Sequence, residues 1–204
     1  MKTHQTSAQR DAAALQAAPP KVIAGPTVKG RGIISYRSGA AKDLAAILDL
    51  NAAVQSWSCC QEFLGAADRG HVPDFRMIDS DGTVWFLDAP DRKHFLEIDF
   101  EDAAREAGAS YRVVPRDEIY SGFRLRNARD LLRYANYTVS LADRIRLLAT
   151  LDDQGSLPMA DCLSVIRGGE PVAAIASLML YGFLEADLDD ALLGPETMVR
   201  RIRS

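Results

Sequence analysis

The chain of 204 residues is 48% hydrophobic and 25% charged, with a formal net charge of −4 and a sequence pI near 5.4. This length allows one large or two small domains with real apolar cores. The negative balance excludes a protein covered uniformly in basic charge, so nucleic acid could bind only at local patches. Three cysteines are too few for a disulfide framework. With no membrane-spanning run and no signal-peptide core in the sequence, we expect a soluble cytoplasmic protein without a membrane partner.

The first elements alternate between helix and strand. Residues 1–26 are rich in Ala, Gln, Ser and Thr, which predicts a flexible tail with a frayed helix around Ala8–Ala17. A short strand is expected at Ile33–Tyr36. A helix is expected over Ala40–Leu50, where leucine and isoleucine recur at helical spacing. The alternation over Val54–Cys60 predicts the next strand.

A hairpin and a helix complete the first half. Strands are expected at Pro73–Ile78 and Thr83–Leu87, because Ser80-Asp-Gly82 between them is a typical hairpin turn. Ile98–Ala107 should form a helix that Gly108 ends, and Tyr111–Pro115 a buried strand. This order predicts an α/β core with a mixed sheet.

The second half is predominantly helical. We expect helices, in chain order, at Leu125–Ala135, Ser140–Leu151, Met159–Ile166 and Pro171–Tyr181. A strand at Phe183–Leu188 and a short return segment follow them, which is the order of a winged helix-turn-helix. With the boundary placed at residues 136–141, the predicted domains are residues 27–138 and 139–204.

Two acids mark the candidate site. Asp74 begins one hairpin strand and Asp88 ends the next. Restriction-type nucleases hold a divalent metal with one carboxylate from each of two adjacent strands, and complete the site with a lysine two residues after the second acid. Here Pro90 occupies that position and cannot deprotonate a water. The alternative, which we favour, is that the acids cap a turn or pair with a nearby arginine. The preceding His71 either makes a strand-entry hydrogen bond or faces these acids.

An ordered set of segments then resembles the TnsA-like endonuclease subunits of heteromeric transposases. The segments that carry the resemblance are Tyr36–Leu44, Leu50–Val54, Gln61, Val72-Pro-Asp-Phe75, Ala104-Arg-Glu-Ala-Gly108, Tyr111-Arg-Val-Val-Pro115 and Asn127–Tyr134. The resemblance covers nearly everything after the tail. It implies a restriction-endonuclease-like (PD-(D/E)xK) mixed-sheet domain followed by a winged-helix domain.

The sequence differs from that family at the positions that carry the family's catalytic residues. By this register the family's two helix glutamates become Arg37 and Ala41. The lysine becomes Pro90, and Asp88 stands where the family usually has glutamate. Only Asp74 matches outright. Because hydrolysis needs an oriented water and charge stabilisation at the phosphate, the sequence predicts a pseudo-nuclease with no cofactor.

Residues close to the site leave an active enzyme open as the alternative. Arg92 or Lys93 could replace the lysine, and a register slip of a few residues would bring Asp43 toward the site. Mg²⁺ tolerates one or two carboxylates with several waters, so Asp74 and Asp88 are the candidate ligands if a metal binds. The alternative function is therefore a metal-dependent DNA endonuclease subunit of a transposase with a rearranged site.

Two basic groups are candidates for contacts with double-stranded DNA. The first is on the entry strand and comprises Lys29, Arg31 and Arg37. The second surrounds the arginine-rich helix and comprises Arg112, Arg116, Arg124, Arg126, Arg129 and Arg133. Arginines at i, i+3 and i+7 of that helix share one face and can contact phosphates without reading sequence. A solvated helix face that happens to carry arginine explains the spacing equally well.

The C-terminal domain is better suited to protein contacts. From residue 139 onward six arginines stand against ten acidic residues, and Pro171–Tyr181 has no Arg, Lys, Asn or Gln for a base edge. Asp187, Asp189 and Asp190 would repel phosphate. We therefore expect a DNA-binding protein in transcriptional or mobile-element control, with a transposase or regulatory partner, or a second copy, on this domain. A pure protein–protein adaptor is the third hypothesis.

Overall fold

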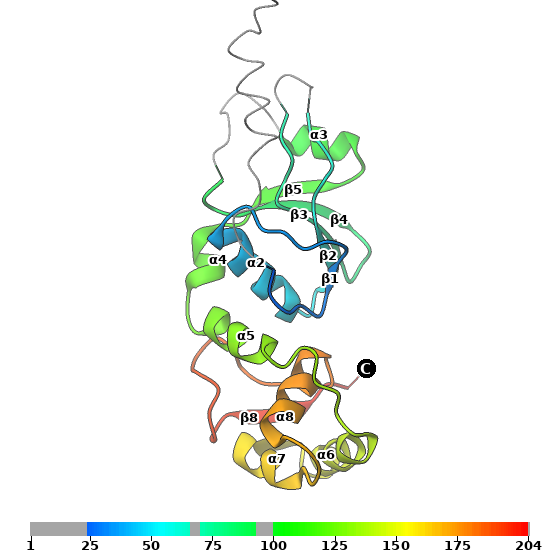
Figure 1. Ribbon diagram of the computed structural model, residues 1–204, viewed down its shortest axis with the longest axis vertical. Helices are drawn as coiled ribbons and strands as arrows, with labels where there is room; N and C mark the ends of the chain where they lie inside the picture. The colour runs from blue at the N-terminus through cyan, green and yellow to red at the C-terminus, as the bar shows by residue number, and fades with distance from the viewer. Residues whose placement is uncertain (1–23, 66–69, 93–99, 204) are drawn as a thin grey trace, which may run out of the picture. The chain divides into compact units, whose positions relative to one another are not determined.

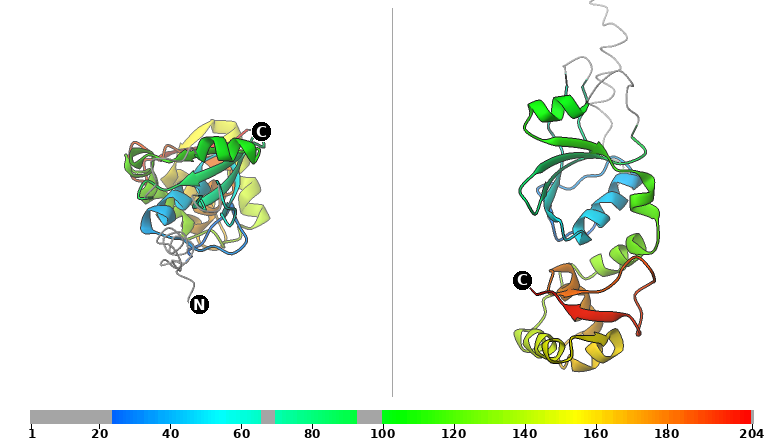
Figure 2. Two further views of the ribbon diagram at one scale, coloured as in Figure 1. Left: turned by 90° about the horizontal axis from the view of Figure 1, so that it is seen from above. Right: turned by 180° about the vertical axis from the view of Figure 1, so that it is seen from behind.

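The protein is described by a computed structural model over residues 24–65, 70–92 and 100–203, in which the chain forms two compact units. The first includes Lys29–Leu48 and Ala53–Glu118, and the second contains Pro26–Val28, Asp49–Ala52 and Ile119–Ser204. Both are α/β, with helices beside a small sheet (Figures 1 and 2). The tail helix expected at Ala8–Ala17 lies outside the described residues.

A five-stranded mixed sheet forms the centre of the first unit, in the order β1-β2-β3-β4-β5. Its strands are β1 Gly30–Arg31, β2 Val54–Cys59, β3 Phe75–Asp79, β4 Val84–Asp88 and β5 Ser110–Val113. The three central strands run antiparallel, whereas β1 is parallel to β2 and β5 is parallel to β4. The predicted α/β core with a mixed sheet is confirmed.

The β3–β4 hairpin owes its register to a tight turn. The carboxylate of Asp79 accepts hydrogen bonds from the main-chain N–H of Asp81 and Thr83, over 3.0 and 2.9 Å. Gly82 adopts a φ of 84°, which a residue with a Cβ rarely does. The resulting register pairs Phe75 with Leu87, and one step further it sets Asp74 opposite Asp88.

Three helices accompany this sheet, α2 Gly39–Leu50, α3 Phe100–Glu106 and α4 Arg116–Tyr120. The Ser38 hydroxyl accepts the N–H of Ala41 over 3.0 Å at the start of α2. Ala41 and Leu44 are buried, so α2 presents an apolar face to the core. Under α3, Phe100 and Ala104 pack with buried residues of the sheet and its loops.

Two strand predictions in this unit need correction. The strand expected at Ile33–Tyr36 is instead β1, and the side chain of Ile33 is 83% exposed. The strand expected at Tyr111–Pro115 ends at Val113, and it is less buried than predicted. Since β5 is an edge strand, Arg112 and Val113 remain exposed. Apolar content alone does not distinguish an edge strand from a central one.

Four helices and three short strands make up most of the second unit. These are α5 Arg124–Leu132, α6 Leu141–Gln154, β6 Ser156–Pro158, α7 Met159–Val165, α8 Pro171–Leu180, β7 Leu184–Glu185 and β8 Met198–Arg201. The strands pair antiparallel in the order β6-β8-β7. All four expected helices are confirmed within a few residues. The strand expected over Phe183–Leu188 is shorter, and β6 was not expected.

The division between the units falls after Glu118, whereas the sequence placed it at residues 136–141. The reason is that hydrogen bonds attach α5 to the segment before β8. Asn127 donates to the carbonyls of Leu188 and Ala191, over 2.9 and 2.8 Å. Its side-chain oxygen accepts the N–H of Leu193 over 3.0 Å. The arginine-rich helix is therefore part of the second unit.

None of the helices described is both long and apolar enough to cross a membrane.

Candidate functional site

Asp74 and Asp88 face each other at the open end of the β3–β4 hairpin. The main-chain N–H of Asp74 donates to Oδ1 of Asp88 over 2.9 Å, and the N–H of Ala89 donates to Oδ2 of Asp74 over 2.9 Å. Both acids are buried, with 6% of Asp74 and 0% of Asp88 exposed. Each carboxylate thus accepts a hydrogen bond from a main-chain donor on the opposite side of the hairpin.

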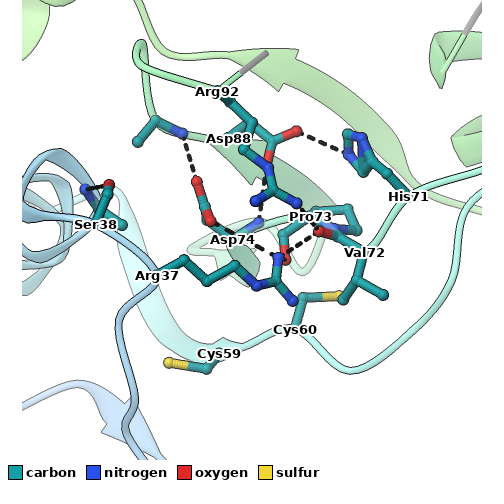
Figure 3. Close-up of polar contacts among 12 residues, drawn as sticks. Arg37, Ser38, Cys59, Cys60, His71, Val72, Pro73, Asp74, Asp88 and Arg92 are labelled. Atoms are coloured by element: carbon teal, nitrogen blue, oxygen red, sulfur yellow. Dashed lines mark hydrogen bonds and ion pairs between the residues drawn. The ribbon is translucent and has the colours of Figure 1, made fainter. Parts of the chain in front are cut away.

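Arg37 brings a positive charge into this site from the segment before α2. Its guanidinium Nη1 donates to the main-chain carbonyls of Val72 and Pro73, the second over 2.9 Å. The same atom lies 3.8 Å from Oδ1 of Asp74 (Figure 3). One cation therefore contacts two carbonyl oxygens and approaches a carboxylate oxygen. Oxygen atoms of these kinds are also the ligands of hard divalent cations.

A second guanidinium approaches the other carboxylate. Nη2 of Arg92 donates to the carbonyl of Val72 over 2.8 Å, and Nε of Arg92 lies 3.6 Å from Oδ1 of Asp88. The two arginines therefore share the Val72 carbonyl, and each approaches one of the two acids (Figure 3). Two positive and two negative groups balance inside a largely buried site, as buried charges require.

The rings of Tyr111 and His71 lie next to Oδ2 of Asp88. The Tyr111 hydroxyl donates to Oδ2 of Asp88 over 2.7 Å, and Nε2 of His71 lies 2.8 Å from the same oxygen. The His71 ring packs against Phe100 with centroids 4.2 Å apart. The main chain of His71 also exchanges hydrogen bonds with Leu64. His71 therefore fulfils both expectations, because its main chain bonds at the strand entry and its ring faces the acid.

Burial dominates the electrostatics of this site. It raises the pKa of Asp88 from 3.8 to about 6, although the hydrogen bond from Tyr111 acts in the opposite direction. Burial also raises the pKa of Asp74, which a main-chain N–H and the two arginines oppose. The pKa of Arg37 is lowered first by burial and then by the like charge of Arg92. The acids are therefore held by main-chain N–H groups, the Tyr111 hydroxyl and two guanidinium groups.

The chemistry that this arrangement can perform is limited. Within the described ranges, no three His, Cys, Asp or Glu side chains are placed to hold a metal ion together, so Asp43 does not join the two acids. A divalent ion at the acids would meet the positive charge of Arg37. Pro90 supplies no base, and the guanidinium of Arg92 offers hydrogen-bond donors and no acceptor. The other proposed substitute, Lys93, lies outside the described residues.

The first basic group does not form a single DNA-facing surface. Arg31 is exposed on β1, and Lys29 is half-buried just before it. Arg37 turns into the site beside Asp74, where carbonyl oxygens accept its donors. Contact between Arg37 and DNA stays a prediction, and it would have to compete with these internal contacts.

The second basic group is partly neutralised by neighbouring acids. Arg112 forms an ion pair with Glu118 in the first unit. In the second unit Nε and Nη2 of Arg124 each donate a hydrogen bond to the carboxylate of Asp189, the one from Nε over 2.7 Å. Arg116 is exposed at the start of α4. Arg112 and Arg124 therefore have carboxylate partners that a phosphate would have to displace.

The remaining three arginines of that group lie along α5. Arg126, Arg129 and Arg133 are all exposed, at the i, i+3 and i+7 positions expected from the sequence. Asp130 is exposed among them. The buried side of the helix carries Leu125 together with other apolar residues and Asn127. The basic face is therefore a real surface of the second unit.

Helix α8, which the sequence predicts to be unsuited to reading base edges, is a core element. Seven of the ten residues of α8 are buried, including Ile175 and Leu178, since α8 packs against α5, α7 and β7. Asp187 accepts the main-chain N–H of Asp189 and Asp190 over 2.7 and 3.1 Å. All three aspartates are exposed, and Asp189 pairs with Arg124, so the expected repulsion of phosphate by this segment stays a prediction.

The sequence did not predict the roles of two residues, Tyr111 beside Asp88 and Asn127 on α5. Tyr111 reaches Asp88 because β5 is parallel to β4, a pairing that hydrophobic patterning does not reveal. Asn127 carried a signal, since it is a polar residue on the apolar side of a helix. Such a residue usually satisfies buried main-chain groups.

No protein-family model matches this chain, and a search of curated proteins finds no relative.

Proposed function

We propose that this protein is a DNA-binding pseudo-nuclease, built on a TnsA-like, restriction-endonuclease-like core with a winged-helix second domain. The observation that carries the proposal is the Arg37 guanidinium between the Val72 and Pro73 carbonyls and Asp74. A nuclease of this class needs a divalent cation beside its acids. Here a side chain of the protein supplies the positive charge, and it cannot activate water.

The second unit supports the winged-helix part of the proposal by its order of elements. The order helix, strand, helix, helix, strand, strand over α6, β6, α7, α8, β7 and β8, with the third strand between the other two, is typical of that fold. Its buried α8 and its acidic residues before β8 favour contact with a protein over base reading. A partner transposase, a regulatory protein or a second copy fits this surface in a role in transcription or mobile-element control.

DNA binding through α5 rests on its exposed arginines. Arg126, Arg129 and Arg133 follow one side of the helix, and no partner approaches Arg126 or Arg133 in the part of the chain that the structure describes. Guanidinium groups on a helix face suit contacts with successive phosphates. Binding of this kind is independent of sequence and weakens steeply with salt, because phosphate contacts release counterions.

One labelled pool of duplexes tests both parts of the proposal in Mg²⁺, in Mn²⁺ and in EDTA. We expect binding that survives EDTA, intact strands under both metals, and affinity that falls steeply as salt rises. Exchanging Arg126, Arg129 and Arg133 together for glutamine should weaken binding to all duplexes alike. Unchanged affinity would remove α5 from the interface. Salt-independent association, or none, would favour the protein adaptor.

A second candidate function has one observation in its favour. Oδ1 of Asp74 is buried and accepts no hydrogen bond within the described residues, which leaves an oxygen for a metal ion. In that case the protein is a metal-dependent endonuclease in which Asp74 and Asp88 hold Mg²⁺. Metal-dependent nicking that disappears in Asp74→Ala would establish this function in place of the pseudo-nuclease.

A further inference from the structure

A cavity of about 360 Å³ lies within the second unit, beneath the arginine face of α5. Its walls come from α5, α7, α8 and the Leu192–Leu193 segment. The apolar lining includes Leu131, Met159, Leu163, Ile175, Ala176 and Met179. The volume is at the small end of the roughly 300–1,000 Å³ of pockets that hold small molecules. Two methionines in the wall add adaptability, because thioether side chains fit ligands of varied shape.

The mouth of this cavity carries charge of one predominant sign. Arg126 and Arg133, two turns apart on α5, line it with a single acid, Asp130. No described residue forms an ion pair with either arginine, whereas Arg124 on the same helix is neutralised by Asp189. Two guanidinium groups therefore lie beside the apolar lining of the cavity.

We propose that this cavity binds a small amphipathic carboxylate, with its hydrocarbon or aromatic body among the apolar side chains and its carboxylate on Arg126 and Arg133. Guanidinium groups match carboxylates with paired hydrogen bonds. Burial of the apolar body supplies most of the affinity, roughly 25 cal/mol per Å² of apolar area. The two arginines select the charged head and fix the orientation of the ligand.

Decanoate is the probe that tests this site, and 1-decanol, with the same chain and no charge, is its control. Titration calorimetry on the intact protein should show saturable decanoate binding. We expect decanol to bind about tenfold more weakly, because it forfeits the charge-assisted contacts. Equal affinities for the two probes, or no saturable binding of decanoate, would overturn the proposal.

Variants on α5 separate the cavity from general surface charge. Arg126→Gln with Arg133→Gln should weaken decanoate binding about tenfold and leave decanol binding unchanged. Arg129→Gln removes one positive charge from the same helix, as each single change in the double variant does, but Arg129 does not line the cavity, so decanoate affinity should be retained. If Arg129→Gln weakens decanoate as much as the double variant does, non-specific attraction explains the binding and the site is refuted.

Ala176→Leu tests the apolar part, because a larger side chain there fills the cavity. It should abolish binding of both probes, and circular dichroism and thermal unfolding should show that the variant remains folded. If it does not, Leu163→Gln, on a half-buried wall residue, provides the same test by making the lining polar. Unchanged binding in a folded variant would place decanoate elsewhere.

A consequence for regulation rests on the proposed function. If α5 also holds DNA, decanoate and phosphates compete for Arg126 and Arg133, and each ligand must weaken the other by the same factor. Saturating decanoate should therefore reduce duplex affinity. Because decanoate binding is measured without DNA, a protein that binds decanoate but no duplex would refute the DNA proposal alone.

Discussion

Asp88 shows how one buried carboxylate is held by its neighbours. Its Oδ1 accepts the Asp74 N–H and faces Arg92, and its Oδ2 faces Tyr111 and His71. These contacts compensate only partly for the loss of water, because burial still raises the pKa of Asp88 to about 6. The folded protein therefore holds a proton on this group at pH values where the unfolded chain has released it.

The stability of the protein should accordingly depend on pH through Asp88. A raised pKa means that the folded state binds more protons between about 4 and 6, so the stability contributed by this group is complete below pH 4 and falls as pH rises to 6. Two pKa units correspond to on the order of 3 kcal/mol. Relative to Asp88→Asn, the wild-type free energy of unfolding should decline by that amount over this window in urea titrations.

The control for this measurement removes the nearby imidazole. His71→Gln serves as a second background, because Nε2 of His71 lies 2.8 Å from Oδ2 of Asp88. The same decline should appear in both backgrounds. A difference between wild type and Asp88→Asn that rises with pH would contradict the assignment.

Arg37→Glu should convert the internal cation into a third carboxylate. In wild type we expect no stabilisation by Mg²⁺ or Mn²⁺, since the guanidinium opposes a second cation beside Asp74. In Arg37→Glu, metal should raise the melting temperature, and a concentration of 100 times the dissociation constant gives about 2.7 kcal/mol. Arg37→Gln is the control, because it removes the positive charge without adding a ligand. A metal effect of the same size in wild type would contradict the role of Arg37.

The sequence predicts part of this site and not the rest. The spacing of Asp74 and Asp88 around a turn motif was enough to set them opposite each other, because hairpin register follows from the turn. The position of Arg37 was not predictable, since its partners Val72 and Pro73 lie 35 and 36 residues away. Long-range contacts of this kind depend on the path of a loop that has no periodicity.

At the scale of elements, α5 differs most between the sequence-based expectation and the structure. The sequence marks it as an arginine-rich linker, yet its buried side belongs to the core of the second unit. Asn127 makes three hydrogen bonds to main-chain groups of residues 188–193. Phe123 adds a main-chain bond to Asp189 over 3.0 Å. The helix pattern was visible in the sequence, but the partners of its polar residues were not.

Asn127→Ala should destabilise the second unit markedly. It removes three hydrogen bonds of about 1 kcal/mol each and leaves main-chain groups of the 188–193 segment without those partners, so a loss of roughly 2–4 kcal/mol is expected. Chemical denaturation monitored by circular dichroism measures it. Asn136→Ala, at an exposed position of the same unit, should change stability by no more than about 0.5 kcal/mol. Equal effects of the two variants would contradict a stabilising role for the three Asn127 hydrogen bonds.

At the scale of the whole molecule, composition and patterning predicted an α/β core followed by a predominantly helical winged-helix part, with the division at residues 136–141; in the structure the division falls after Glu118. A run of helical periodicity does not say which core a helix joins, and α5 joins the second. Long amphipathic elements were found from periodicity, whereas the three-residue β6 is too short for any pattern and β7 is shorter than the strand expected there. Their pairing with β8 is decided by tertiary packing.

Two fragments test where the second unit begins. A fragment of residues 119–204 contains α5 and should fold cooperatively, whereas residues 139–204 lack Asn127 and should be less stable by at least the cost of the Asn127→Ala change. Thermal unfolding and amide exchange of the two fragments provide the comparison. Equal stability would mean that the unit is complete without α5.

The positive charge of Arg37 is tethered to the site, so it is present there at a high effective concentration. A cation that belongs to the chain cannot dissociate into bulk solution, so its local concentration at the Val72 and Pro73 carbonyls is fixed by the length of the side chain. Tethering of this kind corresponds to effective concentrations on the order of millimolar or more, independent of the free ion level. The charge state of the site therefore does not follow the supply of magnesium in its surroundings. A site that depended on a bound metal ion would respond to that supply, and we predict that this one does not.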